Sequence, residues 1–351
     1  MEQSQNTNTV WNLINELSTK KGITEIVINN PRTVFVERDG KFIQLNVSLT
    51  KSDMYSFINE IAAYNKKECN IDFPMVDGTL PDGSRFNAII EPFAHASPAI
   101  TIRRYLKRIQ SFDESPDLFG LSPFWIKFLK AAVHARLNII ISGGTGVGKT
   151  TLLNLLLSEI LKEERIVVIE DTIELSFPHL NIVRLEASFK NLVSQEKVTT
   201  RDLVKNSLRM RPDRIIIGET RGAEFFDLLQ AMNTGHEGSM TSIHSSSAAE
   251  CLSRMETLYL MAGYEVPYHV VRKQMSSAVD LIIQIERARS GERVISQIAE
   301  VSGMEGDVIQ SQSLAHCVDG VLSSNGLPSL HMRKLHEHGE LPLDYFSSNA
   351  R

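Results

Sequence analysis

The sequence predicts an α/β protein in which a small α+β domain precedes a larger domain built around a mostly parallel sheet. Short strand patterns separated by turn signals occupy the region from Gly22 to Arg104, whereas apolar, β-branched runs alternate with helical patterns from Phe124 onward. The 351 residues suffice for roughly two or three domains that each bury a core of their own.

The first domain is expected to cover residues 22–109, after a short extension formed by residues 1–21. Alternating apolar and polar residues, divided by turns such as Asp39-Gly40, predict strands at residues 24–28, 33–37, 42–47, 85–92 and 99–103. A single apolar face predicts a helix over residues 52–65. Together these elements define the small α+β domain.

The larger domain is expected after a linker at residues 110–123, a segment with many Ser, Asp, Pro and Gly residues and no regular apolar period. It should cover residues 124–303, with buried strands at residues 137–142, 165–170, 181–185, 214–218, 238–243 and 280–285, the last paired with residues 294–301. Residues 304–351 show a weaker pattern and are expected to form a tail packed on this domain, with a strand near Val308 and a short helix over residues 332–338.

The most informative motif is the octapeptide GGTGVGKT, which lies between an apolar strand and a helical pattern of leucines. This is the context of a phosphate-binding P-loop, in which glycines let backbone amides surround phosphate oxygens at the start of a helix. Lys149 is expected to reach the β and γ phosphates, and the hydroxyl of Thr150 to bind Mg²⁺. The expected nucleotide-binding residues are Gly143, Gly144, Thr145, Gly146, Val147, Gly148, Lys149, Thr150 and Thr151. A Gly-rich turn that binds no ligand would not explain the strand and helix on either side, so the motif predicts a nucleoside triphosphate site.

Two acidic clusters follow apolar strands and point to hydrolysis. IVVIEDTIEL ends in Glu170, Asp171 and Glu174, and carboxylates there can orient water around Mg²⁺ or accept its proton, although acidic residues also form ordinary turns. In RIIIGETR, Glu219 follows a run of isoleucines that predicts a buried strand, and this is the form of a Walker B element. A surface glutamate that follows a core strand is the alternative. We predict Glu219 as the general base and Glu174 as the second candidate.

A third cluster, TGHEGSMTSIH, places His236 and His244 on either side of a predicted strand, among Gly, Ser and Thr. Histidines in loops are often structural. A neutral imidazole here would be able to hydrogen bond to the γ phosphate or to the glutamate that activates water. The two histidines are therefore predicted to sense the nucleotide or orient the catalytic groups.

Composition indicates which classes of partner and which cellular location to expect. The formal net charge of −5 gives no broad basic surface, so no direct nucleic-acid partner is expected. The three cysteines, Cys69, Cys251 and Cys317, are far apart, which favours free thiols over a zinc site or a disulfide framework. The start lacks a signal-peptide pattern, and no apolar run approaches the roughly 20 residues that span a bilayer. A cytoplasmic protein that reaches a membrane only through a partner is expected.

The set GGTGVGKTTLLN, IEDTIEL, LRMRPDRIIIGETRG and MNTGHEGSMTSIH resembles the secretion ATPases of the type II and type IV superfamily. Within it the chain most resembles the CpaF or TadA branch, the motors of tight-adherence (Flp) pili, with VirB11-like ATPases as nearest relatives. Flanking stretches such as TEIVINNPRTVFVERDGK and GELPLDYF extend the similarity over residues 22–346. The resemblance implies a PAS-like amino-terminal domain and a RecA-like carboxy-terminal domain, a homo-hexameric ring, and ATP with Mg²⁺ near the interdomain cleft. It also implies polytopic inner-membrane platform partners similar to TadB and TadC, and a cytoplasmic location peripheral to the inner membrane.

The resemblance assigns roles to individual residues. Lys149 matches the Walker A lysine and Thr150 the metal ligand that follows it. Glu174 matches the Asp-box glutamate, Glu219 matches the Walker B glutamate, and the His box is matched by His236 and His244. Arg103 matches an arginine that approaches the γ phosphate from the amino-terminal domain. Weaker arginine candidates are Arg85, Arg104, Arg209 and Arg211. Apart from Arg103, the basic run that ends with Lys107 and Arg108 also fits a solvated face or a hinge. The chain departs from the branch in its short amino-terminal region and in SSS after His244.

The expected function is Mg²⁺-dependent ATP hydrolysis that drives assembly of a tight-adherence pilus, with retraction left open. One alternative is a VirB11-like traffic ATPase that moves protein or DNA through a type IV secretion channel. Another is a nucleotide-gated scaffold with little turnover, against which Glu174 and Glu219 argue. A DNA translocase fits least, because the acidic balance offers no groove that would track phosphates.

Overall fold

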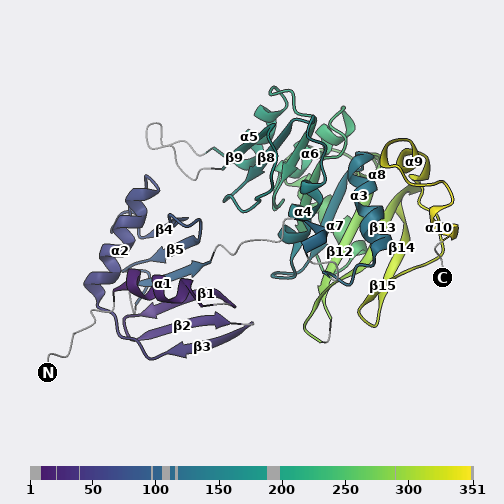
Figure 1. Ribbon diagram of the computed structural model, residues 1–351. Helices are drawn as coiled ribbons and strands as arrows, with labels where there is room; N and C mark the ends of the chain where they lie inside the picture. Colours follow the sequence, from purple (N-terminus) through teal and green to yellow (C-terminus); the bar gives the residue numbers. More distant parts are fainter. Residues whose placement is uncertain are drawn as a thin grey trace. The chain divides into compact units, whose positions relative to one another are not determined.

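The computed structural model describes residues 9–20, 22–38, 40–95, 98–104, 111–114, 118–187, 198–288 and 290–348. The chain forms two compact units, residues 1–107 and residues 108–351, which are described separately (Figure 1). Among the described residues, every helix is too short or too polar to cross a lipid bilayer.

The first unit is built on an antiparallel six-stranded sheet with the order β3-β2-β1-β6-β5-β4. Its strands are β1 Ile23–Asn30, β2 Thr33–Arg38, β3 Lys41–Leu45, β4 Met75–Thr79, β5 Arg85–Ile89 and β6 Ala99–Arg103. Its helices are α1 Val10–Ser18 and α2 Lys51–Tyr64. All the strands predicted in this region are present, and β4 is an additional strand at one edge of the sheet.

One face of this sheet carries the core of the first unit. Alternate residues of β1 and β6, such as Ile26 and Ile102, are fully buried. They pack in one cluster with the apolar face of α2, which includes Phe57 and Ile61. The hydroxyl of Thr50 accepts a hydrogen bond from the backbone N–H of Asp53 at 3.0 Å and caps the start of α2. The predicted α+β domain is thus confirmed. Its helix α2 begins and ends one residue before the expected bounds of residues 52–65.

Helix α1 belongs to this core, although residues 1–21 were expected to be a short extension. Val10, Leu13, Ile14 and Leu17 are buried in the same cluster as α2. The backbone N–H of Val10 donates to Asp53 Oδ2 at 2.9 Å, which ties the two helices together. Residues 1–8 of the expected extension lie outside the described part of the chain. These four apolar residues are spaced three and four apart, so they lie on one face of the short helix α1, and this face packs on the core.

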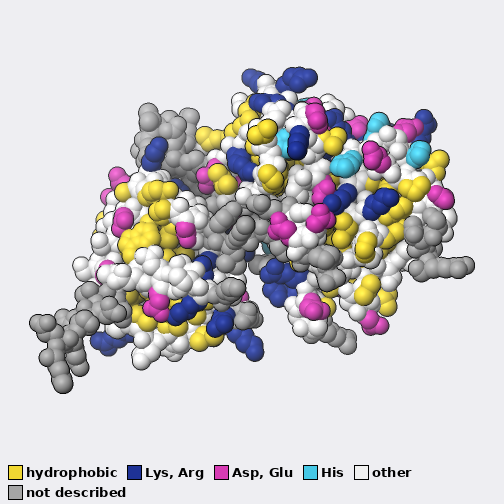
Figure 2. Space-filling model, viewed as in Figure 1, with side chains coloured by type: hydrophobic (Ala, Val, Ile, Leu, Met, Phe, Trp, Pro, Cys, Tyr) yellow, Lys and Arg dark blue, Asp and Glu magenta, His cyan; other side chains and the backbone are white. Residues whose placement is uncertain are grey.

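The first unit also exposes large apolar side chains, and Figure 2 shows hydrophobic groups gathered on its visible face. The exposed large hydrophobic residues of this unit are Phe42, Ile43, Tyr64, Ile71, Phe73, Met75 and Phe93. Met75 lies on β4, which is an edge strand of the sheet. Apolar surface at a strand edge is typical of regions that contact other proteins.

The second unit is built on a nine-stranded sheet with the order β15-β14-β13-β12-β7-β11-β10-β8-β9. Its strands are β7 Ile139–Gly143, β8 Ile166–Glu170, β9 Ile182–Glu186, β10 Arg214–Ile217, β11 Met240–His244, β12 Leu281–Arg287, β13 Arg293–Glu305, β14 Val308–Val318 and β15 Val321–Ser324. Neighbours from β12 to β9 are parallel, and β13, β14 and β15 continue the sheet in antiparallel order. The predicted mostly parallel sheet is confirmed.

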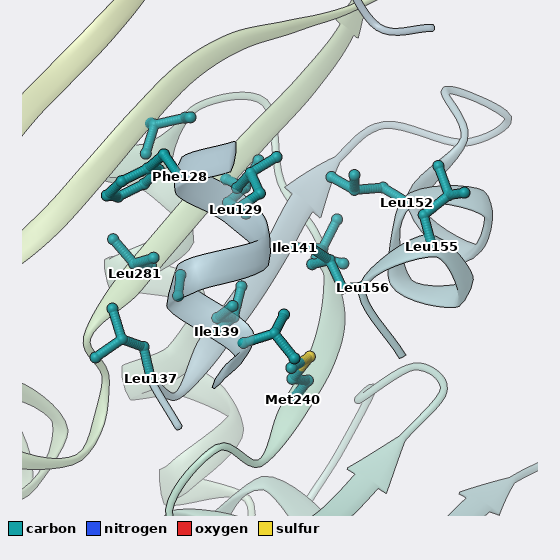
Figure 3. Packing of buried hydrophobic residues seen from close by; sticks show 14 of the residues in the cluster. Phe128, Leu129, Leu137, Ile139, Ile141, Leu152, Leu155, Leu156, Met240 and Leu281 are labelled. Atoms are coloured by element: carbon teal, nitrogen blue, oxygen red, sulfur yellow. The ribbon is translucent and has the colours of Figure 1, made fainter. Parts of the chain in front are cut away.

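Helices cover both faces of this sheet (Figure 1). They are η1 Phe112–Glu114, α3 Pro123–His134, α4 Lys149–Ser158, α5 Thr200–Ser207, α6 Glu224–Asn233, α7 Ala248–Leu260, α8 Tyr268–Ala278, α9 Met332–Gly339 and α10 Tyr345–Ser348. Ile139 and Ile141 of β7 pack in one buried cluster with α3 and α4, whereas Ile140 packs in the other with α6 and α7. Figure 3 shows Leu129 of α3 and Leu156 of α4 beside β7. Burial on both faces explains why these strands are continuous apolar runs.

Residues 110–123, expected to be a linker, contribute to the core of the second unit. Phe112, Phe119 and Leu121 are buried in the cluster that contains α3 and α4. Phe119 also forms a bridge with Val294 at the start of β13. Residue 110 and residues 115–117 of the expected linker lie outside the described part of the chain. Three large apolar residues among the Ser, Pro and Gly residues anchor this segment in spite of its polar composition.

The carboxy-terminal tail is also part of this unit. β14 and β15 extend the sheet, and the Tyr345 ring stacks on Phe124 of α3 with ring centroids 4.5 Å apart. The Tyr345 hydroxyl donates to the backbone carbonyl of Phe124 at 2.6 Å. Residues 304–348 therefore complete the second unit through both backbone pairing and aromatic packing.

Candidate nucleotide-binding site

The carboxyl ends of four neighbouring strands place the predicted site residues along one edge of the second sheet. β7 ends at Gly143, β11 ends at His244, β10 is followed by Glu219 and β8 ends at Glu170. These strands are adjacent in the order β7-β11-β10-β8, and His244 is opposite Gly143 in register. Ligands of open parallel sheets bind beyond this edge. The edge is therefore the candidate binding site.

The loop between β7 and α4 has a shape that requires glycine. Gly146 has a φ of +70° and Gly148 a φ of +106°, both in the left-handed region that other residues rarely adopt. A Cβ atom on Gly143 would lie 2.5 Å from the backbone oxygen of Ile285. The three glycines thus allow a tight loop that leads directly into α4.

Helix α4 begins at Lys149 with Gly148 as its N-cap. Glycine has no side chain that could cap the helix, so the first backbone N–H groups of α4 remain available to a ligand in the loop. Thr150 and Thr151 lie in this first turn and are partly exposed, whereas Val147 is buried in the core beneath the loop. A helix start of this kind favours an anionic group such as phosphate.

Lys149 is folded back over the loop. Its Nζ donates to the backbone carbonyls of Gly143 at 3.0 Å and Gly144 at 2.7 Å, and lies 3.3 Å from Nδ1 of His244. The side chain is largely buried, and this burial lowers the pKa of Lys149, against the opposing effect of Glu219. The lysine is thus held in the loop, close to the position expected for phosphate.

His244 connects Lys149 to Glu219. Its Nε2 contacts Oε1 of Glu219. A protonated lysine can only donate, so Nδ1 of His244 accepts and Nε2 carries the hydrogen that faces the carboxylate. Burial lowers the pKa of His244, and the positive charges of Lys149 and Arg221 lower it further, against the opposing effect of Glu219. The direction of this shift favours the neutral ring at pH 7.

Arg221 holds the other oxygen of Glu219. Its Nη2 donates to Glu219 Oε2. The hydrogen bond that Arg221 donates to Glu219 raises the pKa of Arg221, and the charges of Asp171 and Glu174 raise it further. Asp171 and Glu174 thus lie near enough to interact with this guanidinium. The structure brings the P-loop, His244, Glu219, Arg221 and the segment with Glu174 together.

A model of the family described as "Type II/IV secretion system protein" matches residues 8–325 of the chain. The chain belongs to this family. The match spans both units and contains every predicted site residue.

Relatives of this secretion family member include proteins of conjugation and type IV secretion. It is 34% identical over 297 residues to the conjugal transfer protein TrbB of Rhizobium radiobacter, covering 84% of this chain and 88% of that protein. It is 32% identical over 308 residues to the type IV secretion system protein PtlH of Bordetella pertussis, covering 80% of this chain and 90% of that protein.

Solved structures support the fold of the secretion family member. The ATPase DotB of Legionella pneumophila matches with a TM-score of 0.60 at 22% identity, over 84% of this chain and 81% of that chain. The pilus retraction motor PilT with bound ADP matches with a TM-score of 0.60 at 20% identity, over 89% of this chain and 84% of that chain. These similarities confirm the predicted α/β architecture, a RecA-like domain with a smaller amino-terminal domain.

His236 is not brought to the P-loop of its own chain, contrary to the expectation that both histidines lie at the nucleotide. It lies in the connection between α6 and β11, where its backbone N–H donates to the carbonyl of Ala231 at 3.2 Å and its carbonyl accepts from the hydroxyl of Ser239 at 2.7 Å. This connection enters β11 at its amino end, whereas His244 lies at its carboxyl end. The two ends of a strand lie at opposite edges of a sheet, so only His244 reaches the site.

The arginine candidates differ in what the structure shows. Arg103 lies on β6 of the first unit, half-exposed, with Nε 4.0 Å from Glu25 Oε1. Its approach to the γ phosphate stays a prediction. Arg104 donates through Nη2 to the carbonyl of Ser18 at 2.8 Å and through Nη1 to that of Leu17 at 3.1 Å. It therefore caps the end of α1, which gives it a structural role.

Two of the remaining arginine candidates, Arg209 and Arg211, lie away from the candidate edge of the second unit. Arg209 and Arg211 are exposed and precede β10, so they lie at the amino end of that strand. Arg85 is opposite Arg103 in the register of β5 and β6, within the first unit. Lys107 and Arg108 lie outside the described residues.

The residues of the site fit a magnesium nucleotide. Glycines Gly146 and Gly148 shape the cradle, and Thr150 offers a hydroxyl in the first turn of α4. In the part of the chain that the structure describes, no three His, Cys, Asp or Glu side chains are grouped to hold a metal by themselves. Mg²⁺ commonly binds through few protein ligands together with phosphate oxygens and water. Thr150 is accordingly the expected protein ligand.

Glu170 and Arg221 are the two residues whose importance sequence reasoning missed. Both stand inside motifs that were singled out, but Glu170 was named only among the carboxylates that could act on water, and Arg221 was assigned no role. The signal for Glu170 is its place at the end of a fully apolar strand, which predicts burial of the carboxylate. The signal for Arg221 is its spacing of two residues from Glu219, which lets the two side chains meet after a strand ends.

Proposed function

We propose that the chain binds ATP with Mg²⁺ at the P-loop and hydrolyses it, and that it does so as a homo-hexameric ring. One observation carries this proposal: Lys149 at the start of α4, His244 at the end of β11 and Glu219 after β10 form one continuous series of polar contacts. A phosphate-binding lysine, a neutral imidazole and a carboxylate in series provide the groups that hydrolysis of a bound triphosphate needs.

The reaction is in-line attack of water on the γ phosphorus, with breakage of the bond to the β-phosphate oxygen. Glu219 accepts the proton that the water loses, since its carboxylate is the strand-end base beside the loop. His244 orients that carboxylate through Nε2. Lys149 stabilises the negative charge on the phosphates. Mg²⁺, held by Thr150 and phosphate oxygens, would supply further charge neutralisation.

Glu174 and Arg103 have supporting roles in this proposal. Glu174 orients the attacking water from the segment after β8. Arg103, which the resemblance matches to an arginine near the γ phosphate, contributes a cation from the first unit, and such a cation accelerates phosphoryl transfer only when it closes on the transferred group. Release of phosphate would loosen this contact and let the two units move by a hinge or rigid-body step.

The client that best fits the sequence motifs is a tight-adherence pilus. In this proposal the ring works in the cytoplasm at the inner membrane and transmits its stroke to polytopic platform proteins similar to TadB and TadC. The stroke drives pilin subunits out of the bilayer during assembly. The support is the CpaF- or TadA-like motif set, and the proposal needs no direct contact with nucleic acid.

A second candidate is a traffic ATPase of a conjugation or type IV secretion channel. It is supported by the similarity to the conjugal transfer protein TrbB and the type IV secretion system protein PtlH, which are 34% and 32% identical to this chain. The two candidates differ in the membrane protein that accelerates turnover. Purified chain would be mixed with liposomes that carry either a TadC-like platform protein or VirB-like channel components, and phosphate release would be compared.

The hydrolysis itself is tested first. The purified full chain should bind a fluorescent ATP analogue with Mg²⁺, form hexamers in sedimentation velocity, and release phosphate continuously. Binding and assembly without phosphate release would instead support a nucleotide-gated scaffold. Lack of nucleotide binding would refute both forms of the proposal.

A further inference from the structure

The irregular segment that carries Glu174, residues 171–177, is held in place by side chains from three different elements. Irregular backbone beside a catalytic site needs such support, because no helix or sheet ladder fixes its course. The supporting side chains are Glu170 at the end of β8, Asn154 in α4 and Arg184 in β9.

Glu170 makes the central contact. Its Oε1 accepts two hydrogen bonds, from the backbone N–H of Glu174 and from that of Leu175, both at 2.9 Å. The side chain is 5% exposed, and Oε2 is buried without a hydrogen-bond partner among the described residues. All of its hydrogen bonding is thus directed at the backbone of the Glu174 segment. A buried carboxylate that accepts from two successive amides fixes their direction.

Glu170 also touches the strand that presents Glu219. A Cβ atom on Gly218 would lie 3.0 Å from Cγ and 3.3 Å from Oε1 of Glu170. The backbone N–H of Gly218 donates to the carbonyl of Ile169 at 2.9 Å, which sets β10 directly beside the end of β8. The Glu170 side chain therefore occupies the space between the Glu174 segment and the residue before Glu219.

Two further contacts complete the support. Asn154, fully buried in α4, accepts from the backbone N–H of Ser176 at 2.8 Å. Arg184 donates to the carbonyl of Leu175 at 2.6 Å, and its guanidinium lies 5.3 Å from the centre of the Phe177 ring. Because α4 begins at the P-loop, the Asn154 contact also relates the Glu174 segment to the nucleotide loop.

We propose that Glu170 is a positioning residue that fixes the backbone of Glu174 against the strand end that carries Glu219. It does not touch the reacting groups. It holds two candidate catalytic carboxylates at a constant separation by bonding to one segment and packing against the other. This inference rests on the proposed ATP hydrolysis for its effect on rate, but the support of the backbone is independent of turnover.

The test compares Glu170→Ala, which removes the acceptor, with Glu170→Gln, which keeps an acceptor oxygen of the same reach. In Glu170→Ala we expect kcat to fall about 10- to 100-fold, since a small misplacement of a catalytic group has an effect of this size, with KM for ATP unchanged. Glu170→Gln should restore kcat to within about threefold of wild type. Glu163→Ala, at an exposed position on the same connection into β8, is the matched control and should behave as wild type.

Hydrogen exchange of the amides of Glu174 and Leu175 provides the second measurement. Exchange should be about tenfold or more faster in Glu170→Ala and unchanged in Glu170→Gln. If Glu170→Ala does not fold, Glu170→Asp, which is one methylene too short, should show the same exchange. Should wild type fail to hydrolyse ATP, the proposed function fails while exchange still decides the positioning. Equal exchange in wild type and Glu170→Ala, or equal kcat in a wild type that turns over, overturns the inference.

Discussion

Lys149 and His244, which are 95 residues apart in the sequence, bring Nζ and Nδ1 to within 3.3 Å of each other. The contact exists because β7 and β11 are neighbouring parallel strands, with His244 opposite Gly143. It joins the lysine expected at the phosphates to the imidazole that contacts Glu219. A change in charge at the γ phosphate would therefore reach the proposed base through a single ring.

Replacement of Glu219 by glutamine should abolish hydrolysis and retain nucleotide binding. The amide keeps the size of the side chain but cannot accept the proton of water, so kcat should fall by about 100-fold or more. Phosphate release measures the loss, and titration with a fluorescent ATP analogue measures binding. Glu163→Gln, at an exposed position, serves as the control. Turnover at the wild-type rate would remove Glu219 from the role of base.

His244 and His236 form a natural matched pair. His244→Gln should lower kcat about 10- to 100-fold because the imidazole that links Lys149 to Glu219 is lost. His236→Gln should leave the Kd for ATP unchanged, since His236 enters β11 at the opposite edge of the sheet. A variant of His236 that loses ATP affinity, with His244→Gln unaffected, would contradict this placement.

The pH dependence of turnover should report His244. Burial, with help from Lys149 and Arg221, lowers the pKa of His244 from its ordinary 6.5, so its neutral form persists at pH 7. Protonation at lower pH would prevent Nδ1 from accepting a hydrogen bond from Lys149. We expect kcat of wild type to be constant near pH 7 and to decline only below pH 6.5. The decline should be absent from the residual activity of His244→Gln and present in Glu170→Gln.

Glu170→Gln should also change the pH dependence of stability. Burial raises the pKa of Glu170 from 4.5 to about 6, against the opposing hydrogen bonds from Glu174 and Leu175. The protonated form is favoured in the folded state, so this contribution to stability is fully present below pH 4.5 and is lost as the pH rises through about 6. Relative to wild type, the free energy of unfolding of Glu170→Gln should therefore gain about 2 kcal/mol between pH 4.5 and pH 7. Urea unfolding at both pH values measures it, and a pH-independent difference would contradict the burial of an ionised carboxylate.

The sequence predicted the second sheet well because its strands are buried on both faces. Each appears as a short apolar run that periodicity identifies, and the P-loop, Glu219 and His244 lie at the ends of three such runs. The polar connections that follow parallel strands must meet at one edge, so the site could be expected from strand order alone. Strand order itself is a tertiary property. The separation of His236 from His244 is not, because the two histidines flank a single predicted strand, and it could have been foreseen from the sequence.

Local composition misled where a few apolar residues decide the packing. Phe112 and Phe119 anchor a segment whose Ser, Pro and Gly content predicted a linker, and the short helix α1 packs on the first core through four residues. The support of the Glu174 segment by Glu170 and Asn154 was also beyond sequence reasoning. Hydrogen bonds from side chains to irregular backbone leave no periodic pattern in the sequence, because they depend on which segments the tertiary fold brings together.

Glu164→Ala should destabilise the second unit by leaving a buried cation without its partner. Arg214 is fully buried and donates to both oxygens of Glu164, at 2.9 and 2.7 Å. Removal of one partner of a buried ion pair typically costs about 3–5 kcal/mol. Urea unfolding should show this loss, whereas the exposed neighbour Glu163→Ala should remain within about 0.5 kcal/mol of wild type. A similar small effect of both variants would show that water reaches Arg214.

Nucleotide hydrolysis by this chain is tested most directly by steady-state phosphate release from ATP with Mg²⁺, measured for the purified wild type beside Lys149→Ala. Wild type should release phosphate continuously, and Lys149→Ala should be slower by about 100-fold or more, because the cation that stabilises the phosphate charge is gone. Equal rates for the two proteins, or a wild type that neither binds nor hydrolyses ATP, would contradict the assignment of the P-loop as an ATPase site.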